Sequence, residues 1–231
     1  MIVPHQPLAP LPTLTPIDAR VLGTLIENAR TVPDSYPLSL HALVQGCNQK
    51  TSREPTMELG EAEVLAALDA LQSSDLVRPS SGARTARYEH NFPRRLGVPE
   101  QSAVLLGVLL LRGAQTAAEL RLNTERWYRF ADVSSVQGFL EELRDRSPDK
   151  GGALAALLPR EPGAREQRWV QLLSAPAQNG AAQGDTDNNL DAPRSLDLRE
   201  RVQALEREVQ QLRAALQALC AELGMSPPGQ P

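Results

Sequence analysis

Two short stretches of the sequence carry arginines in the same pattern. Residues 82–88 (Gly-Ala-Arg-Thr-Ala-Arg-Tyr) and 163–169 (Gly-Ala-Arg-Glu-Gln-Arg-Trp) share a glycine, two arginines and an aromatic residue at equal spacing. Arginine has a permanent charge and a rigid planar fork, so it suits contact with the phosphate oxygens of a nucleic acid. Each stretch is typical of a glycine turn that leads into a β-strand. The candidate nucleic-acid contacts are Arg84, Arg87, Arg165 and Arg168.

The segments around these stretches follow one order of elements, which occurs twice. Apolar residues at helical spacing predict three helices in each half, beginning near Pro16, Ser39, Glu61, Pro99, Thr116 and Ala131. Short strands are expected at 76–78, 84–90, 153–158 and 168–173. Helix, short strand, helix, helix and hairpin is the order of a winged helix-turn-helix domain. The predicted fold class is α+β, mainly α, with two tandem winged helix-turn-helix domains and a C-terminal coiled-coil helix.

Matching positions indicate that the second half duplicates the first. The pairs are Leu22-Gly23 with Leu106-Gly107, and Val64, Leu68 and Leu71 with Val136, Leu140 and Leu143. Because the spacing between copies is unequal, we expect insertions in the loops at 48–58 and 147–152. The predicted division is a disordered proline-rich tail at 1–15, winged-helix domains at 16–95 and 96–173, a flexible linker at 174–195, a coiled-coil helix at 196–223 and a disordered tail at 224–231.

The C-terminal stretch carries an unbroken heptad repeat. Its a and d positions, the expected dimerisation residues, are Leu198, Val202, Leu205, Val209, Leu212, Leu216, Leu219 and Leu223. Val at a with Leu at d favours a parallel two-stranded coil, in which Arg201 would face Glu206 of the other chain. We therefore expect a homodimer, with folding of the helix back onto its own domains as the alternative.

Composition argues against an enzyme. The net charge is −4, His5, His41 and His90 are isolated, and Cys47 and Cys220 lie far apart. No metal-ligand spacing, phosphate-cradling glycine loop or nucleophile elbow is present, so we expect no catalytic residue, no metal and no cofactor. The sequence also lacks a secretory signal and an apolar run long enough to span a bilayer, which predicts a cytoplasmic protein without a membrane partner.

Two further cations and a set of acids bear on nucleic-acid binding. Lys50 and Arg53, in the polar loop at 48–55, would extend the basic surface. The third helix of a helix-turn-helix normally reads bases through Arg, Lys, Asn or Gln. Here both third helices are acidic, through Glu58, Glu61, Glu63, Asp69, Asp132, Glu141 and Glu142. Sequence-specific reading of the major groove is therefore not expected.

Four stretches resemble the YceH family of bacterial proteins. They are Asp18-Ala19-Arg20-Val21-Leu22, residues 33–40 (Pro-Asp-Ser-Tyr-Pro-Leu-Ser-Leu), residues 47–55 (Cys-Asn-Gln-Lys-Thr-Ser-Arg-Glu-Pro), and Thr124-Glu125-Arg126 with Phe130-Ala131-Asp132. The resemblance covers residues 16–173, and the string at 47–55 makes it specific. It implies tandem winged helices and brings no biochemical activity with it. Gly60 stands where the family has a capping serine.

Two hypotheses follow from these patterns. The first is a dimeric, regulator-like protein whose hairpin arginines contact DNA phosphates, with binding that depends strongly on salt. The second is a protein-interaction adaptor, in which the acidic helices and an aromatic cluster at Trp127, Tyr128 and Phe130 dock an unidentified protein. Packing of this cluster in the core is its simpler interpretation. The hairpin arginines likewise have a simpler interpretation, as solvated residues that protect a strand edge.

Overall fold

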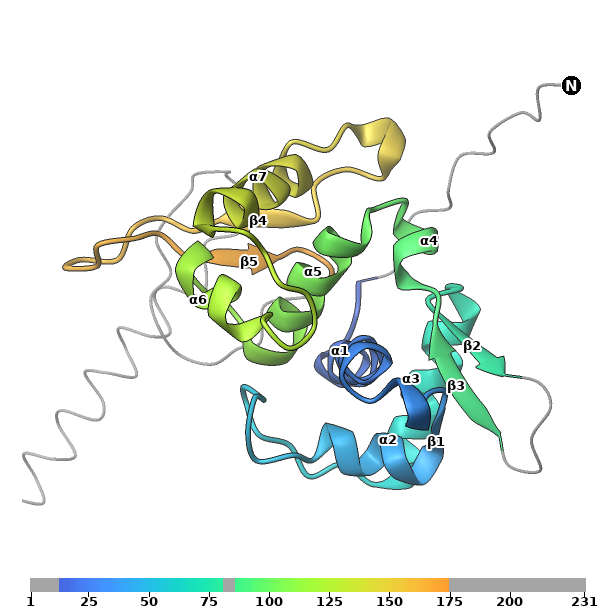
Figure 1. Ribbon diagram of the computed structural model, residues 1–231. Helices are drawn as coiled ribbons and strands as arrows, with labels where there is room; N and C mark the ends of the chain where they lie inside the picture. Colours follow the sequence, from blue (N-terminus) through green and yellow to red (C-terminus); the bar gives the residue numbers. More distant parts are fainter. Residues whose placement is uncertain (1–12, 81–85, 175–231) are drawn as a thin grey trace, which may run out of the picture. The chain divides into compact units, whose positions relative to one another are not determined.

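The computed structural model describes residues 13–80 and 86–174, which all belong to the unit Met1–Ala181. This part of the chain is mixed α+β, about half helical, with two small antiparallel sheets (Figure 1). The predicted coiled coil with its dimerisation residues lies outside the described residues, and so does Arg84. Within the described ranges, no helix combines the length and the apolar character needed to cross a bilayer.

The first half begins with a helix whose start is fixed by local chemistry. The Thr15 hydroxyl accepts a hydrogen bond from the Asp18 backbone N–H, the Asp18 carboxylate accepts one from Thr15, and Pro16 occupies the first turn. The helices of this half are α1 (Pro16–Thr31), α2 (Leu40–Cys47), α3 (Glu61–Ser73) and α4 (Phe92–Leu96). Its strands are β1 (Leu38–Ser39), β2 (Val77–Ser80) and β3 (Arg87–His90), in the sheet order β1-β3-β2.

The second half repeats this order with a smaller sheet. Its helices are α5 (Glu100–Arg112), α6 (Ala117–Asn123) and α7 (Val133–Arg144), and its strands are β4 (Ala155–Leu157) and β5 (Trp169–Gln171). Instead of a strand corresponding to β1, Gln115 alone bridges to Trp169 in antiparallel fashion. The predicted strands at 153–158 and 168–173 are therefore shorter than expected, whereas all six predicted helices are present.

Equivalent positions in the two halves make equivalent backbone contacts. The N–H of Leu76 donates to Leu71 at 2.9 Å, and the N–H of Leu154 donates to Leu143 at the same distance. All four leucines are buried. Between α7 and β4 the short 3₁₀ helix Pro148–Lys150 provides one of the insertions that the spacing predicts. Leu71 and Leu143, which the predicted matching paired, thus make the same kind of contact in their two halves.

Helix α3 starts at Glu61 although Gly60 offers no side chain for capping. The Glu63 carboxylate reaches back and accepts a hydrogen bond from the Gly60 N–H at 2.8 Å. This bond satisfies one of the amide groups that a helix N-terminus leaves free. Replacement of the expected serine by glycine therefore does not displace the start of the helix.

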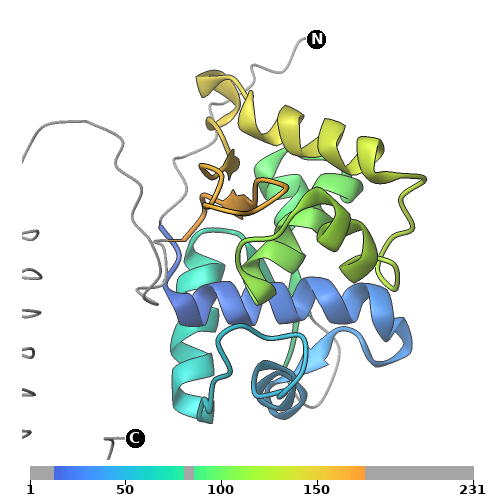
Figure 2. The same cartoon turned by 90° about the vertical axis from the view of Figure 1, so that its left-hand side faces the viewer.

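Helices α1 and α5, the first helices of the two halves, pack against each other (Figure 2). A Cβ added at Gly23 would lie 2.8 Å from Leu111, and one added at Gly107 would lie 2.9 Å from Trp127 and 3.0 Å from Ile26. Because these distances are shorter than normal carbon–carbon contacts, any larger residue at either position would force the neighbouring side chains to move. One continuous cluster of buried apolar residues consequently extends through both halves.

Candidate functional site

Arg87 and Arg168 occupy the same structural position in the two halves. Nη1 of Arg87 donates to the Pro37 carbonyl at 2.7 Å, and Nη1 of Arg168 donates to the Ala114 carbonyl at 2.9 Å. Both carbonyls lie two residues before the residue that caps the following helix, Ser39 for α2 and Thr116 for α6. Arg87 in β3 and Arg168 directly before β5 thus each tie the end of the hairpin to the entry of the second helix of their half.

A carboxylate distinguishes the two arginines. Arg168 forms a two-pronged ion pair with Glu119, with nitrogen–oxygen distances of 2.9 and 3.1 Å. The same carboxylate accepts a hydrogen bond from the Thr116 N–H, which completes a capping box at the start of α6. In the first half Ala42 follows Ser39 at this spacing, and Arg87 is exposed with no ion pair among the described residues. The charge of Arg168 is therefore neutralised, whereas that of Arg87 is available.

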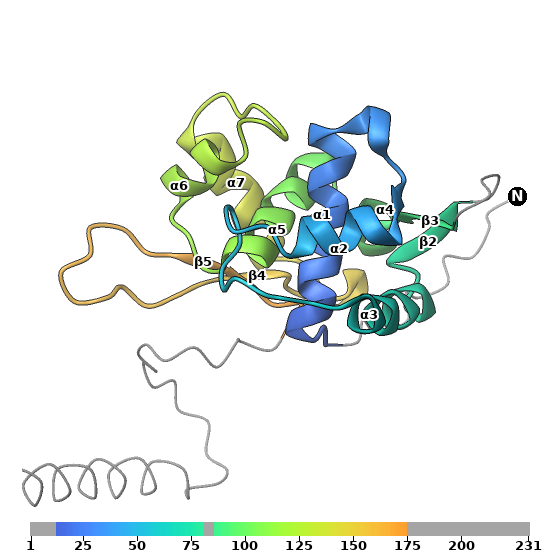
Figure 3. The same cartoon turned by 90° about the horizontal axis from the view of Figure 1, so that it is seen from below.

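Arg165 lies in the second hairpin loop, residues 158–168, which joins β4 to β5 and extends away from the rest of the unit (Figures 1 and 3). In both views this loop lies at the end of the unit opposite to β2 and β3. Gly163 provides its turn with a φ of 82°. Arg165 and Arg160 are exposed and have no bonded partner within the described ranges, but Glu161 and Glu166 are exposed beside them.

Arg53, predicted to contact nucleic acid, is instead buried. It is only 4% exposed, and its guanidinium donates to the Gly46 carbonyl at 3.1 and 2.9 Å and pairs with Glu27 at 2.5 Å. Nearby, the buried guanidinium of Arg20 donates to the carbonyls of Cys47 and Pro55. These two arginines hold the loop between α2 and α3. Arg53 is therefore not placed to contact a phosphate.

Lys50 is exposed, as a phosphate contact requires, but it is paired. Its ammonium lies 2.8 Å from the Glu58 carboxylate, and the side chains of both residues are largely exposed. The hydrogen bond from Lys50 lowers the pKa of Glu58, so the acid stays charged. An exposed pair of this kind contributes little and can exchange partners.

The N-termini of the third helices repel anions. Glu61 and Glu63 lie in the first turn of α3. At α7 the Asp132 carboxylate caps the helix and accepts hydrogen bonds from Ser135 and Ser134, which lower the pKa of Asp132 to about 2. A permanent negative charge at this point opposes insertion of the helix between phosphate backbones.

The connection between α6 and α7 carries cations that the sequence analysis passed over. Arg126 and Arg129 are exposed and form no ion pair within the described part of the chain. Their position between the second and third predicted helices of this half was the available signal. Of the neighbouring aromatic cluster, Phe130 is buried and Trp127 is half-buried beside Gly107, which favours a packing role.

His90 is the one titratable group of the first sheet with a large pKa shift. Its backbone N–H donates to the Tyr36 hydroxyl at 2.6 Å, the two rings lie 6.0 Å apart, and its Nδ1 is buried without a described partner. Burial and the nearby charge of Arg30 lower the pKa of His90 to about 4. The imidazole is therefore neutral at physiological pH.

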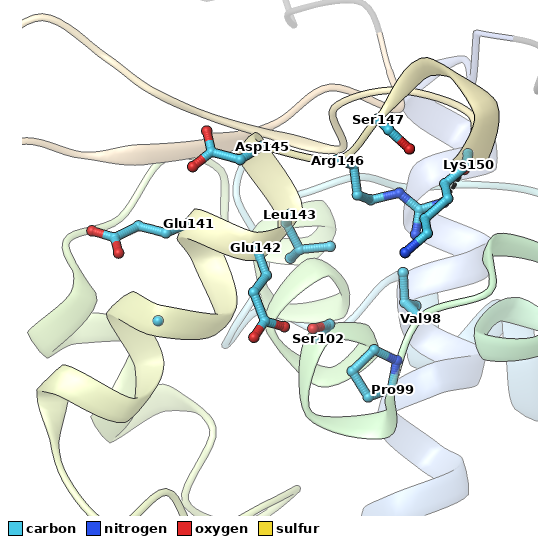
Figure 4. Close-up of a pocket in the computed structure, with 11 residues that line it drawn as sticks. Val98, Pro99, Ser102, Glu141, Glu142, Leu143, Asp145, Arg146, Ser147 and Lys150 are labelled. Carbon is cyan, nitrogen blue, oxygen red and sulfur yellow. Dashed lines mark hydrogen bonds between the residues drawn. The ribbon is translucent and has the colours of Figure 1, made fainter.

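An open depression of about 580 Å³ lies between the start of α5 and the end of α7 (Figure 4). Its lining mixes charged and apolar side chains, and it contains Ser102, which is 1% exposed and has a hydroxyl without a hydrogen-bond partner among the described residues. Among residues 13–80 and 86–174, no three His, Cys, Asp or Glu side chains come together as a metal site.

Comparison with known proteins gives one consistent result. Residues 14–164 match the family described as "Protein of unknown function, DUF480". The chain is similar to proteins named UPF0502 protein, at 61% identity to that of Albidiferax ferrireducens over the full length of both chains. Identity is 58% to that of Verminephrobacter eiseniae, over 97% of this chain and 92% of the relative, and 50% to that of Cupriavidus taiwanensis, over 92% and 88%. With this match and these identities, the chain belongs to the DUF480/UPF0502 family of bacterial proteins.

Proposed function

We propose that each half is a winged helix-turn-helix domain and that the loops joining the last two strands are the wings. The order α1-β1-α2-α3-β2-β3 and the sheet order β1-β3-β2 support this assignment for the first half. In the second half α5, α6, α7 and the β4–β5 hairpin follow in the same order, with the Gln115–Trp169 bridge in place of the first strand. The name YceH is proposed for the same family on the sequence resemblance alone.

The function we propose is weak, shape-directed association with DNA through exposed arginines. The observation that carries it is the pair of cations at the hairpins, Arg87 and Arg165, which are exposed and have no carboxylate partner among the described residues. Arg126 and Arg129 could add further phosphate contacts. The acidic N-termini of α3 and α7 argue against base reading, so sequence preference should be low.

Dimerisation through residues 198–223 belongs to the same proposal. Two copies joined by a coil would double the number of hairpins that meet DNA, and linked weak contacts raise the overall affinity without any new contact. Cytoplasmic location is part of the proposal, as DNA binding in a bacterium requires.

The test is fluorescence anisotropy of a labelled mixed-sequence duplex with the full chain across a salt series. The hairpin variant carries Arg87→Ala and Arg165→Ala. Each lost phosphate contact should reduce the slope of log affinity against log salt by about one unit. Adding Arg84→Ala then tests the remaining predicted arginine.

The matched control changes two exposed arginines that already have partners. In Arg78→Ala with Arg144→Ala the net charge falls by the same amount, but these arginines pair with Asp75 and Asp145. The control should bind DNA as the unmodified chain does. Equal losses in both variants, or no salt-dependent binding of the unmodified chain, would refute the proposal.

A protein-interaction adaptor is the second candidate, and exposed apolar side chains favour it. Leu122 on α6 is 66% exposed and Val133 at the start of α7 is 38% exposed, next to the acidic cap of that helix. Affinity capture with the full chain and with Leu122→Ser tests this candidate. A protein that is retained by the unmodified chain and lost from the variant would support the adaptor.

A further inference from the structure

The depression between α5 and α7 has opposite charges on its two sides. In Figure 4 the Glu142 carboxylate lies beside Ser102, while the Lys150 ammonium and the Arg146 guanidinium lie on the other side. Glu141 and Asp145, although they belong to the same lining, point away from this space. The charges are therefore separated across the opening.

Neither side neutralises its own charge. Glu142 and Lys150 form no ion pair within the described residues, whereas Asp145 is paired with Arg144. The Arg146 guanidinium donates to backbone carbonyls, including that of Leu96 at 2.8 Å, and has no carboxylate partner in the described chain. Both signs of charge are available to a ligand.

A buried hydroxyl strengthens the anionic side. Ser102 is 1% exposed, and its oxygen has no hydrogen-bond partner among the described residues. Leaving a buried polar atom unpaired is costly, and such atoms in native structures ask for a partner. In Figure 4 this oxygen lies on the same side of the depression as the Glu142 carboxylate, so the two together offer acceptors to an ammonium group.

The part of the lining between the charged sides is apolar. Val98 and Leu143 are buried at 8% and 2% exposure, and Pro99 lies next to them. A volume of about 580 Å³ is within the range of small-molecule sites. The ligand should therefore have an apolar middle and two charged ends.

We propose that this depression binds a small zwitterion, with the chemistry of an amino acid or a short peptide. Its ammonium group pairs with Glu142 and Ser102, its carboxylate faces Lys150 and Arg146, and its apolar part covers Val98 and Leu143. The hairpin arginines contribute nothing to this lining, so the site stands apart from DNA binding.

The test is isothermal titration of the full chain with L-leucine and with the dipeptide Ala-Leu, which distinguish a free amino acid from a peptide. The better of the two probes should bind with a dissociation constant of about 1 mM or below. Its N-acetylated form, which lacks the ammonium, and its C-terminal amide, which lacks the carboxylate, should each bind at least about tenfold more weakly.

Variants assign each charge to its side. Glu142→Gln should weaken binding of the zwitterion, and the zwitterion and its N-acetylated form should then bind this variant equally well. Lys150→Met should also weaken binding of the zwitterion, and the zwitterion and its C-terminal amide should then bind equally well. Glu125→Gln and Lys50→Met are the matched controls, because each makes the same charge change at an exposed residue that does not line the depression. Both should leave binding unchanged.

Three results would overturn the proposal. They are the absence of saturable binding by either probe, equal affinity for the zwitterion and both blocked forms, and an equal loss in Glu142→Gln and Glu125→Gln. Ser102→Ala gives a further check, since it should weaken binding of the ammonium-bearing probes and leave the N-acetylated form unaffected. Thermal unfolding of each variant verifies that the fold is intact.

Discussion

Both halves have an arginine at the same structural position, but within the described residues the charge of only one of the two arginines is neutralised by an ion pair. Arg87 and Arg168 donate to corresponding carbonyls, but only Arg168 meets a glutamate, Glu119, where the first half has Ala42. One side-chain difference in the second helix therefore decides whether the strand arginine is available to another molecule. Equal residues in a duplicated sequence need not have equal roles, because their neighbours change.

The connection between the second and third helices also differs between the halves, but here the free cations of the described chain lie in the second half. Between α2 and α3 both cations form ion pairs within the chain, since Arg53 is buried with Glu27 and Lys50 pairs with Glu58. Between α6 and α7, Arg126 and Arg129 are exposed and unpaired within the described residues. In the first half the strand arginine is therefore without an ion pair in the described part of the chain, and the cations of the connection are paired. In the second half the arrangement is reversed.

The largest effect is expected at the contact that the halves share. Gly107→Val and Gly23→Val should each lower the free energy of unfolding by about 3 kcal/mol, because their new carbons would overlap Trp127 and Ile26 in one case and Leu111 in the other. Urea unfolding measures the loss.

Gly138 provides the matched control for these glycines. It is a helical glycine of α7 with no atom within 4 Å of its added Cβ. Gly138→Ala should stabilise by about 0.5 to 1 kcal/mol through helix propensity. A cost below 1 kcal/mol for both valine variants would show that the α1–α5 contact is looser than described.

Loss of the buried ion pair in the first connection should have an effect of similar size. Arg53→Ala leaves Glu27 charged and mostly buried, and breaking such a pair costs about 3 kcal/mol. Lys50→Ala removes the exposed pair with Glu58 and should change stability by less than about 0.5 kcal/mol. Similar values for the two variants in urea unfolding would contradict the structural role given to Arg53.

The first half should also be the acid-sensitive one. The pKa of His90 falls from 6.5 in the unfolded chain to about 4 when folded, so between these values the unfolded chain binds more protons and stability falls as pH falls. The loss should reach about 2 kcal/mol between pH 7.5 and 5.

The second half has Gln171 at the position of His90, which suggests the control. His90→Gln should flatten the dependence of unfolding free energy on pH over this window. The low pKa of Asp132 has no influence there, because its contribution is lost only below its ordinary value of 3.8. An unchanged slope in His90→Gln would show that another group titrates.

The smallest effect comes from exchanging the residues that distinguish the two arginines. Ala42→Glu should build a capping box with Ser39 and an ion pair with Arg87, and thereby stabilise the chain by about 0.5 to 1 kcal/mol. Glu119→Ala should remove the corresponding contacts at α6 at a similar cost.

The exchange also sharpens the DNA proposal. Ala42→Glu should reduce the salt-dependent affinity for a duplex, and Glu119→Ala, which frees Arg168, should increase it. Because Glu119→Ala also removes one negative charge, Asp149→Ala, at an exposed residue with no ion pair among the described residues, is its matched control. An equal gain of affinity in Glu119→Ala and Asp149→Ala would mean that bulk charge, and not the state of each arginine, governs binding.

The sequence was sufficient to predict the helices and their matching between halves, because buried positions such as Leu71 and Leu143 keep their spacing. It also located the insertion at Pro148–Lys150 from unequal offsets. The role of Arg53 could not be predicted in this way, since Arg53 lies in a loop and its partner Glu27 lies 26 residues earlier, on α1. Helix α4 was not predicted, because it is a single short turn and its sequence, with Pro93 and two arginines, does not indicate a helix.

Partnerships across the chain were equally hidden. The Glu119 that pairs with Arg168 lies 49 residues before it, and Ser102 meets the depression only because α5 and α7 come together. A linear pattern shows which charges exist. The fold determines which of these charges form ion pairs within the chain.

The opposite placement of β2–β3 and the second hairpin loop has a consequence for stoichiometry. Hairpins at opposite ends of one unit would both meet a single duplex only if that duplex ran along the whole unit (Figures 1 and 3). If both hairpins bind DNA, a chain mixed with shorter duplexes would hold two of them, and on long DNA the two contacts would cross-link or loop it.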